Sequence, residues 1–508
     1  MDESVPATPG DLAAYSTAVV EHPDGRVELQ DERCITASNL YNHDLAPIAV
    51  SGRTWSTYNY AALWVAMSAC IPTYMLSSGL MASGMNWWQA ILTILLGNII
   101  VLIPILLNSH PGTKYGIPFP VFARAAYGTN GSNLPAIMRA LVACGWFGIQ
   151  SWIGGSALHN GLVAFIPQWK TLLGADPVGG YPVTQWVSFM IFWGINILII
   201  YKGMDLLRKF QGFAAPFVMI MTTALMIWSV SNAHGLGNLL SNPGKLTSFA
   251  AFFPVFIPSL TAIIGFWATL SLNMPDFTRF GRSQREQTIG QVIALPTAMT
   301  VFSTMAVMIT SASEIIYPHV SMDKLWNPVN LVSLFDNPVL VSISMFTIAV
   351  ATLSVNIAAN VVSPANDFAN AFPRWISFKT GGLITGILGI VLQPWKLVAD
   401  PSGFIYAWLQ GYSGGLGSIA GVLIADYWLV RKKKLVLAEL YLHTGEYQYT
   451  AGWNWKAVAA TVIGCLFAWI GAFVAPLKPL YDYAWFVGFA TSAAIYYGLM
   501  SRRSSGSN

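Results

Sequence analysis

The chain has 508 residues, of which 55% are hydrophobic and only 9% are charged, whereas soluble globular proteins are about 25% charged. This composition excludes an ordinary soluble enzyme. The net charge is only +4, and we expect the basic residues to flank membrane helices rather than to form a nucleic-acid surface.

The N-terminal segment, residues 1–52, is polar and rich in acidic residues. It has neither the apolar stretch of a signal peptide nor the basic character of a transit sequence. We therefore expect residues 1–52 to form a cytoplasmic tail.

Long apolar stretches recur through the rest of the chain, each close to the roughly 20 residues that cross a hydrocarbon core of about 30 Å. Helices satisfy every backbone polar group inside the segment, which lipid demands. The sequence thus predicts an all-α integral membrane protein with about 12 transmembrane helices, at residues 56–80, 87–107, 134–166, 185–201, 210–231, 249–273, 289–312, 338–362, 380–393, 403–429, 454–474 and 479–499. The ninth barely spans, so a buried or re-entrant helix is its alternative.

The Lys and Arg residues predict the orientation, because positively charged loops stay in the cytoplasm. With both termini inside, 21 basic residues fall on the inner side and five on the outer side. An odd number of spans would mix the two groups. We expect a multi-pass protein of the plasma membrane with both termini in the cytoplasm.

Two predicted spans carry residues that interrupt helices. Pro72 should disturb the turn around Ser68 and Ala69 in the first span, because proline lacks a backbone donor. The sixth span begins with Pro254 and Pro258, has Gly265 in its middle and ends at Pro275. Broken helices often build transport sites at the bilayer midplane, although Pro and Gly are also simply common in membrane helices.

Spans one and six open successive groups of five helices, and an odd number of spans per group forces opposite orientations. We therefore predict two inverted repeats, residues 53–231 and 249–429. A basic cytoplasmic loop follows at 430–453, then two additional helices at 454–499 and a cytoplasmic tail at 500–508. We expect the run Arg431 to Lys434 in that loop to anchor the topology beside anionic lipid.

The middles of the spans hold almost no ionisable residues. Asp276, Asp367 and Asp426 are predicted at or beyond the cytoplasmic ends of helices. This pattern argues against a charged substrate and a carboxylate proton relay, and it also argues against a membrane-embedded enzyme. His159 lies inside the third span, where we expect it to hydrogen-bond a neighbouring helix rather than carry protons.

The third span contains Trp146 and Gln150, which share a helix face because they are four residues apart. An indole beside an amide offers a stacking surface, a donor and an acceptor. Glycines at 145, 148, 154 and 155 leave room for close approach. Trp267 follows Gly265 at the expected break in span six, so a planar ring could lie between the two indoles.

The eighth span carries two amides, Asn356 and Asn360, inside a hydrophobic helix. Burying an amide without partners costs roughly 2–7 kcal/mol. Each side chain must therefore meet another helix, water or a ligand, and the spacing leaves structural bridging and ligand binding open.

Several ordered blocks resemble one known family of permeases. They are NHDLAP (42–47), RTWSTYNYAALW (53–64), GMNWWQA (84–90), HPGTKYGIPFPVFARAAYG (110–128), ACGWFGIQSWIGG (143–155), AANVVSPANDF (358–368), FPRWISFKTG (372–381) and LIADYWLVRKKK (423–434). The chain from about residue 42 to residue 455 resembles the nucleobase:cation symporter family 1, the hydantoin, allantoin, uracil and cytosine-type permeases.

The resemblance implies the leucine-transporter-type fold, two inverted five-helix repeats plus two helices, and cation-coupled uptake by alternating access. It places Trp146 and Trp267 at the positions of two ring-stacking tryptophans. Gln150 and Asn360 match the amide-binding residues of the pattern. Cys70 replaces a glutamine of the pattern, Phe266 replaces a glycine, and Ile405 aligns with a gating leucine, so the preferred substrate is open.

The family's sodium site maps onto two helices of this chain, the first and the eighth. Its ligands would be backbone oxygens of Ala66, Ala69 and Ala351, together with Ser354 and position 355. Val355 stands where the pattern has threonine, and a valine side chain cannot bind a cation. We therefore expect weak or absent sodium dependence, which leaves sodium or a proton as the coupling cation, with no cofactor.

The resulting hypothesis is a secondary active transporter for a planar, neutral heterocyclic amide such as allantoin, hydantoin or uracil. The alternatives are a purine or cytosine-type nucleobase or nucleoside permease of the same fold, a channel, and a nutrient sensor that binds without transport. We expect the chain to work as a monomer surrounded by membrane lipid, without a nucleic-acid partner.

Overall fold

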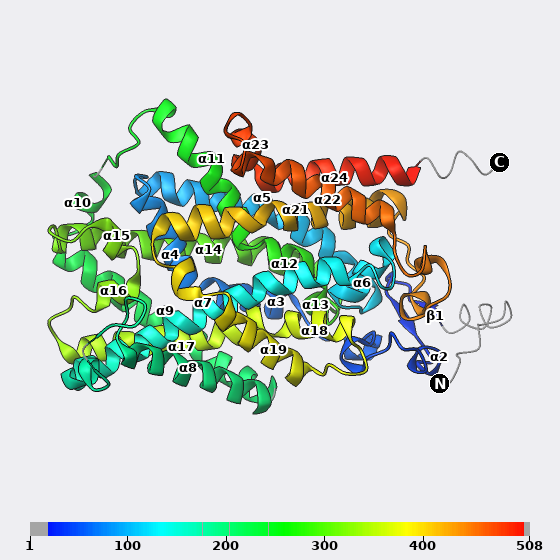
Figure 1. Cartoon of the computed structure of the whole chain (residues 1–508), viewed down its shortest axis with the longest axis horizontal. Helices are drawn as coiled ribbons and strands as arrows, with labels where there is room; N and C mark the ends of the chain where they lie inside the picture. The colour runs from blue at the N-terminus through cyan, green and yellow to red at the C-terminus, as the bar shows by residue number, and fades with distance from the viewer. Residues whose placement is uncertain (1–18, 175, 203, 242, 502–508) are drawn as a thin grey trace.

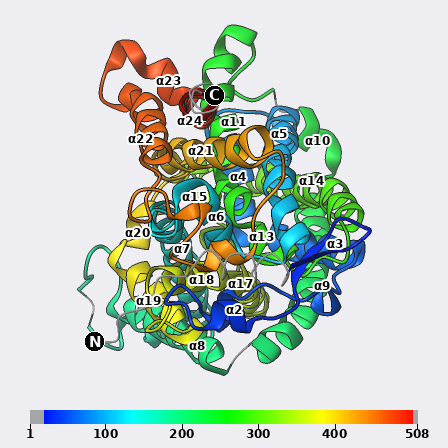
Figure 2. The same ribbon diagram turned by 90° about the vertical axis from the view of Figure 1, so that its right-hand side faces the viewer.

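The computed structural model describes residues 19–501, except residues 175, 203 and 242. Most of the described chain is helical, and the long helices run along the long axis of the molecule (Figure 1). The sheet found there is one antiparallel pair, β1 (Val19–Glu21) with β2 (Val27–Leu29). Viewed from the end that carries β1, most of the long helices are seen nearly end-on (Figure 2).

Each predicted span corresponds to one helix or one interrupted helix. In chain order they are α3 with α4 (Thr57–Ser68 and Ile71–Ala82), α5 (Trp87–Tyr115), α7 (Asn133–Phe165), α8 (Val183–Lys202), α9 (Met204–Asn232), α11 with α12 (Phe249–Phe266 and Ala268–Asn273), α14 (Gln284–Ile316), α17 with α18 (Pro338–Asn360 and Val362–Ala371), α19 (Phe378–Val391), η4 with α21 and η5 (Gly403–Leu409, Gln410–Ile424 and Ala425–Val430), α22 (Trp455–Trp469) and α24 (Ala484–Ser501).

Shorter helices connect these elements. They are α2 (Arg33–Thr36), η1 (His43–Leu45), η2 (Val50–Gly52), α6 (Phe119–Tyr127), η3 (Pro167–Thr171), α10 (Leu236–Ser241), α13 (Pro275–Thr278), α15 (Met322–Leu325), α16 (Pro328–Val332), α20 (Pro394–Leu397), η6 (Ala438–Tyr441), η7 (Glu446–Gln448), η8 (Ile470–Ala472), η9 (Ala475–Leu477) and α23 (Lys478–Asp482).

Among the described residues, eight helices are long and apolar enough to cross a membrane, and the bent pair α3 and α4 makes a ninth. Pro216–Asn232 of α9 and Phe378–Val391, which is α19, are shorter apolar helices. The chain is therefore a multi-pass membrane protein, while the number of about 12 spans stays a prediction. α19 has the 14 residues expected of the weakest span.

Three of the long helices are interrupted near their middles. α3 and α4 meet at an angle of 56°, and Pro72 stands in the first turn of α4, where a missing backbone donor costs nothing. α11 ends before Trp267, whose φ of −102° and ψ of 5° are not helical. The expected breaks in spans one and six are thus confirmed. A third break, at Val361 between α17 and α18, was not predicted.

α7 runs through the centre of the bundle, and its glycines allow neighbouring helices to approach closely. A Cβ atom at Gly148 would overlap the backbone carbonyl of Gly389 in α19, and one at Gly155 would overlap the backbone of Phe189 in α8. This confirms the close approach expected of the glycines in the third span. α7 is therefore held in a fixed position against α8 and α19.

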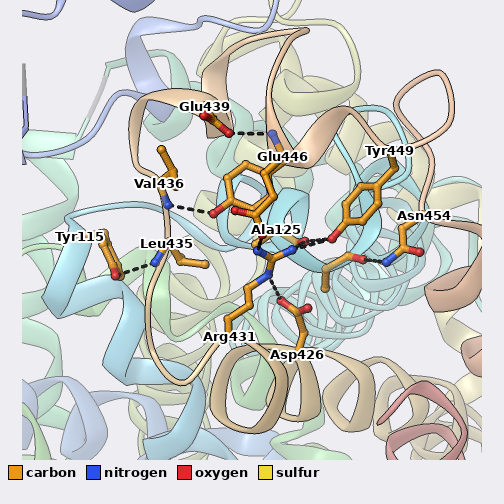
Figure 3. A network of polar contacts seen from close by, with 12 residues as sticks. Tyr115, Ala125, Asp426, Arg431, Leu435, Val436, Glu439, Glu446, Tyr449 and Asn454 are labelled. Atoms are coloured by element: carbon orange, nitrogen blue, oxygen red, sulfur yellow. Dashed lines mark hydrogen bonds and ion pairs between the residues drawn. The ribbon is translucent and has the colours of Figure 1, made fainter. Parts of the chain in front are cut away.

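The loop after η5 is fixed to the bundle by Arg431 (Figure 3). Its guanidinium donates to Asp426 at 2.8 Å, to Tyr449 Oη at 2.6 Å and to the carbonyl of Ala125 at 3.0 Å, and it also pairs with Glu446. The side chain of Arg431 is only 6% exposed. The prediction that the run lies beside lipid is therefore wrong for Arg431, while for the exposed Lys432, Lys433 and Lys434 it stays a prediction.

Both ends of the described chain, β1 and the last turn of α24, lie at the same end of the bundle (Figure 1). An even number of crossings has this consequence. The side of the membrane on which this end lies stays a prediction from the distribution of Lys and Arg.

Candidate functional site

A pocket lies where the interruptions of α3, α11 and α17 meet the middle of α7. Its empty space is about 370 Å³, including the part open to solvent. Its lining residues are Met67, Cys70, Pro72, Trp146, Gln150, Phe266, Trp267, Thr269, Leu270, Val355, Ala359 and Asn360. Six of the seven predicted substrate-contact residues are thus gathered in one pocket, and Ile405 is the exception.

Three aromatic rings that contact one another line this pocket. Phe266 lies edge-on to Trp146, with ring centroids 5.3 Å apart and planes at 78°. It also lies edge-on to Trp267, at 4.9 Å and 90°. Both indoles are about 95% buried. The bulk expected at position 266 is therefore in contact with both tryptophans.

Tyr412, in α21, positions the first tryptophan. The indole Nε1 of Trp146 donates to Tyr412 Oη at 3.1 Å, and this hydroxyl donates to the carbonyl of Gly265 at 2.9 Å. The carbonyl belongs to the last turn of α11, beside the break at Trp267. Sequence reasoning missed Tyr412, because no spacing rule connects a residue of α21 with α7.

Two polar atoms of the pocket residues have no hydrogen-bond partner among the described residues. They are the amide oxygen of Gln150 and the indole Nε1 of Trp267, and both are buried. Leaving a buried donor or acceptor unpaired costs about 1–3 kcal/mol. A ligand with one N–H group and one carbonyl group would satisfy both atoms.

The two asparagines of span eight have different surroundings. Asn356 donates to the carbonyl of Phe147 and to Ser151 Oγ, both in α7, at 3.3 and 3.2 Å. Asn360 donates to Asn356 Oδ1 at 3.0 Å and also lines the pocket. Asn356 is therefore a structural bridge, whereas Asn360 can reach a ligand.

Cys70 and Ile405 contribute to the site in other ways. Cys70 lines the pocket, and its Sγ lies 3.2 Å from Thr73 Oγ1. Ile405, in η4, is fully buried and packs against Gly79 in α4, where a Cβ atom would come within 2.8 Å of its Cδ1. Ile405 thus lies at a helix contact outside the pocket lining.

The residues predicted for a cation site lie around the first break and α17. Cys70 N donates to Ser68 O at 2.9 Å, so the carbonyl of Ala66 lacks the bond that an unbroken helix would supply. Ala69 and Ala351 are buried in one apolar cluster. Ser354 and Val355 lie beside Ala66 along a neighbouring cavity.

That neighbouring cavity is larger, about 1510 Å³ including the part open to solvent. It shares Met67 and Val355 with the pocket. From there it extends between α3, α9 and α17 to Trp55 and Tyr58 at the start of α3. Its lining therefore runs from two residues of the pocket to the start of α3.

Three carboxylates that the sequence places at or beyond helix ends are buried in the protein. Asp276, Asp367 and Asp426 are each at least 98% buried. Asp367 pairs with Arg139 at 3.4 Å, and neither side chain is exposed. The three residues lie in α13, α18 and η5, which end or follow the long helices as expected. What the sequence did not predict is that protein surrounds these carboxylates on all sides.

His159 lies in α7, buried beside the backbone of Thr184 in α8. Its Nδ1 has no hydrogen-bond partner among the described residues, so the hydrogen bond expected to a neighbouring helix stays a prediction. It does not line the pocket.

Comparison with known proteins places the chain among permeases. Residues 47–488 match the family model described as "Permease for cytosine/purines, uracil, thiamine, allantoin". An allantoin permease of Bacillus subtilis is 41% identical over 91% of this chain and 94% of its own length. A purine-uracil permease of Arabidopsis thaliana is 40% identical over 91% of this chain and 78% of its own length.

Solved structures agree with this placement. The inward-facing conformation of the transporter Mhp1 has a TM-score of 0.73 at 26% identity, covering 92% of this chain and 95% of that one. Its closed conformation with bromovinylhydantoin bound has the same TM-score at 24% identity, covering 92% and 96%. Mhp1 is a nucleobase-cation-symport-1 family transporter. This chain therefore belongs to the same family of cytosine, purine, uracil, thiamine and allantoin permeases, whose members are transporters and not enzymes.

Proposed function

We propose that the protein is a cation-coupled symporter that carries a planar, neutral heterocyclic amide such as allantoin, hydantoin or uracil by alternating access. The observation that carries this proposal is the pocket itself. Two indoles, an unpartnered amide oxygen and an unpartnered indole N–H meet at helix breaks inside the bundle. A flat ring with imide or ureide edges matches these groups in shape and in hydrogen bonding.

The binding energy would come from both kinds of contact. A base stacked on an aromatic side chain gains about 1–3 kcal/mol in other proteins. Hydrogen bonds to Gln150, Trp267 and Asn360 would then orient the ring. The similarity of the chain to an allantoin permease along most of its length supports a ligand of this size and polarity.

Alternating access is supported by the unequal surroundings of the pocket. On one side the larger cavity leads to Trp55 and Tyr58. On another, Ile405 packs against Gly79 and Phe404 lies edge-on to Trp146 at 5.9 Å. We propose that this is an inward-facing arrangement, with the gate at Ile405 closed and the cytoplasmic path open.

The coupling cation in this proposal is sodium or a proton. The carbonyl freed at Ala66 and the nearby residues Ala69, Ala351 and Ser354 are suited to a sodium ion, which prefers oxygen ligands. Val355 removes the side-chain oxygen that the family pattern supplies. We therefore propose that sodium contributes weakly and that a proton is the alternative.

A second candidate is a purine- or cytosine-type permease of the same fold, favoured by the resemblance to a purine-uracil permease. The two candidates differ in the edges of the ring. Uracil and allantoin present N–H groups beside carbonyls, whereas cytosine presents an unprotonated ring nitrogen beside an amino group. Competition between these compounds decides between the candidates.

Counterflow in proteoliposomes tests the proposal. Vesicles loaded with unlabelled allantoin, uracil or cytosine are diluted into labelled compound, and transient accumulation above equilibrium is measured. A carrier for ring amides should accumulate label when loaded with its own substrate, and we expect allantoin or uracil to support this. Accumulation with none of the three would contradict the proposal, whereas equilibration without overshoot would indicate a channel.

A further inference from the structure

A row of three buried asparagines leads from α8 to the wall of the pocket. Asn196 and Asn356 are fully buried, and Asn360 is 7% exposed. Asn196 Nδ2 donates to the carbonyl of Phe192 at 2.9 Å. Asn356 Nδ2 donates to Asn196 Oδ1 at 3.2 Å, and Asn360 Nδ2 donates to Asn356 Oδ1 at 3.0 Å.

The direction of every hydrogen bond in this row is determined at its far end. The carbonyl of Phe192 can only accept, so Asn196 must turn its amino group towards it and its oxygen towards Asn356. Asn356 then donates to that oxygen, and the carbonyl of Phe147 fixes the same orientation from a second side at 3.3 Å. Reversing one amide would place two acceptor oxygens about 3 Å apart. The row therefore removes the ambiguity that the similar shapes of the amide oxygen and nitrogen would otherwise leave.

The orientation has a consequence at the pocket. With Nδ2 held against Asn356, Oδ1 of Asn360 is the acceptor that remains for a ligand. The amide oxygen of Gln150 is a second acceptor, and Trp267 Nε1 is a donor. Neither atom has a hydrogen-bond partner among the described residues. The pocket thus offers at least two acceptors, Asn360 Oδ1 and Gln150 Oε1, and at least one donor, Trp267 Nε1.

We propose that Asn196 and Asn356 are positioning residues that hold Asn360 as a hydrogen-bond acceptor, so that the pocket selects rings presenting an N–H group at that edge. This inference rests on the proposed function and deepens it, because it names the ligand class: cyclic imides and ureides with a free ring N–H. Rings whose matching nitrogen is alkylated or unprotonated are disfavoured.

A purely structural role for the row predicts something different. Two helices can be joined by amides of either orientation, and removing one would weaken the bundle without changing which ligand edge is preferred. The useful readout is therefore a ratio of ligand affinities, which a loss of folded protein does not change.

The experiment measures inhibition constants for uracil, 1-methyluracil and 3-methyluracil against labelled uptake. The variants are Asn196→Leu and Asn356→Leu. Asn98→Leu is a matched control, because Asn98 is also fully buried in a long helix and donates to the carbonyl four residues earlier, Ile94 at 2.8 Å. Asn98 does not line the pocket.

In the unmodified protein, one N-methylated compound should bind about 10-fold or more weakly than uracil, because an acceptor is left unpaired. In Asn196→Leu and Asn356→Leu this ratio should fall to about 3-fold or less, since a released Asn360 can turn its amino group to the ligand. Asn98→Leu should keep the original ratio. Should the leucine variants fail to reach the membrane, Asn356→Ser, whose side chain is too short to hold Asn360, is expected to lower the ratio in the same way.

Two results would overturn the inference: equal binding of all three compounds by the unmodified protein, or an unchanged ratio in variants that still transport. Neither result would contradict the proposed function. That proposal would fail instead if no ring amide inhibited uptake or supported counterflow.

Discussion

At the scale of single residues, Trp146 and Trp267 carry the proposed recognition of a flat ring. Replacing either with alanine removes a stacking surface worth about 1–3 kcal/mol, so Trp146→Ala and Trp267→Ala should lower uptake of labelled allantoin or uracil by about 10-fold or more. Trp485→Ala is the control, because Trp485 is equally buried but stacks on Phe489 in α24. Equal uptake by all three variants and the unmodified protein would exclude the stacking role.

We expect Phe266 to restrict the size of the ligand. Its ring touches both indoles edge-on, so Phe266→Gly should open space beside the ring-binding position. We expect hydantoins with bulky ring substituents to gain about 10-fold in affinity relative to unsubstituted hydantoin, measured by competition. Phe404→Ala removes another ring that lies edge-on to Trp146 but outside the pocket lining. The same gain in affinity in Phe404→Ala would show that Phe266 does not specifically restrict ligand size.

The residues of the pocket differed in how far the sequence could predict them. Trp146 and Gln150 could be predicted because they are four residues apart in a helix that is rich in glycine. Trp267 could be predicted because it follows Gly265 at the expected break. Tyr412 and Asn196 could not be found in this way, because their contacts depend on how α21 packs against α7 and how α8 packs against α17. Local patterns predict which face of a helix is polar, but tertiary packing determines its partner.

At the scale of elements, α17 separates the predicted cation position from the ring pocket, and Val355 lines the space on both sides. Val355→Thr restores the oxygen of the family pattern, so uptake should become more dependent on sodium, measured with sodium replaced by choline from about pH 5 to pH 8. Val350→Thr is the control, because it adds a hydroxyl elsewhere on the same helix. It should not change the sodium dependence of uptake. Complete loss of uptake without sodium in the unmodified protein would contradict the reduced role assigned to sodium.

Arg431 joins η5 to the loop that follows it (Figure 3). Burial alone would lower the pKa of its guanidinium, but Asp426, Tyr449, Tyr447 and Glu446 raise the pKa above its ordinary value, so it stays charged. Arg431→Gln leaves Asp426 buried and uncompensated, which costs about 3–5 kcal/mol. We expect a lower melting temperature in detergent, while Arg374→Gln, at an exposed loop position, should melt like the unmodified protein. Identical melting of both variants would exclude a stabilising role for Arg431.

The interrupted helices show which elements the sequence could predict. Pro72 and Gly265 mark the breaks in α3/α4 and α11/α12, as expected. The break at Val361 was missed, although Pro364 supplies its cause. A proline there cannot donate to the carbonyl of Asn360 four residues earlier, so α17 ends and α18 begins. The hydrophobic run through this segment concealed the break, because hydropathy records burial and not backbone hydrogen bonds.

At the scale of the whole molecule, the ends of the described chain lie at one end of the bundle (Figure 1). The lining of the larger cavity includes Trp55 and Tyr58 at the start of α3. Composition and the distribution of Lys and Arg were enough to predict a multi-pass membrane protein. They could not show which state of a transport cycle the chain adopts, because open and closed arrangements use the same helices. The contact of Ile405 with Gly79 and the cavity beside Val355 depend on how the helices are tilted.

The most direct test of a ring held between two indoles is an experimental structure of the protein with allantoin or uracil bound. The ring should lie in the pocket against both Trp146 and Trp267, with a ring N–H about 2.7–3.2 Å from Asn360 Oδ1. A ligand found instead in the separate apolar cavity lined by Tyr74 and Phe302, or touching neither tryptophan, would contradict the account.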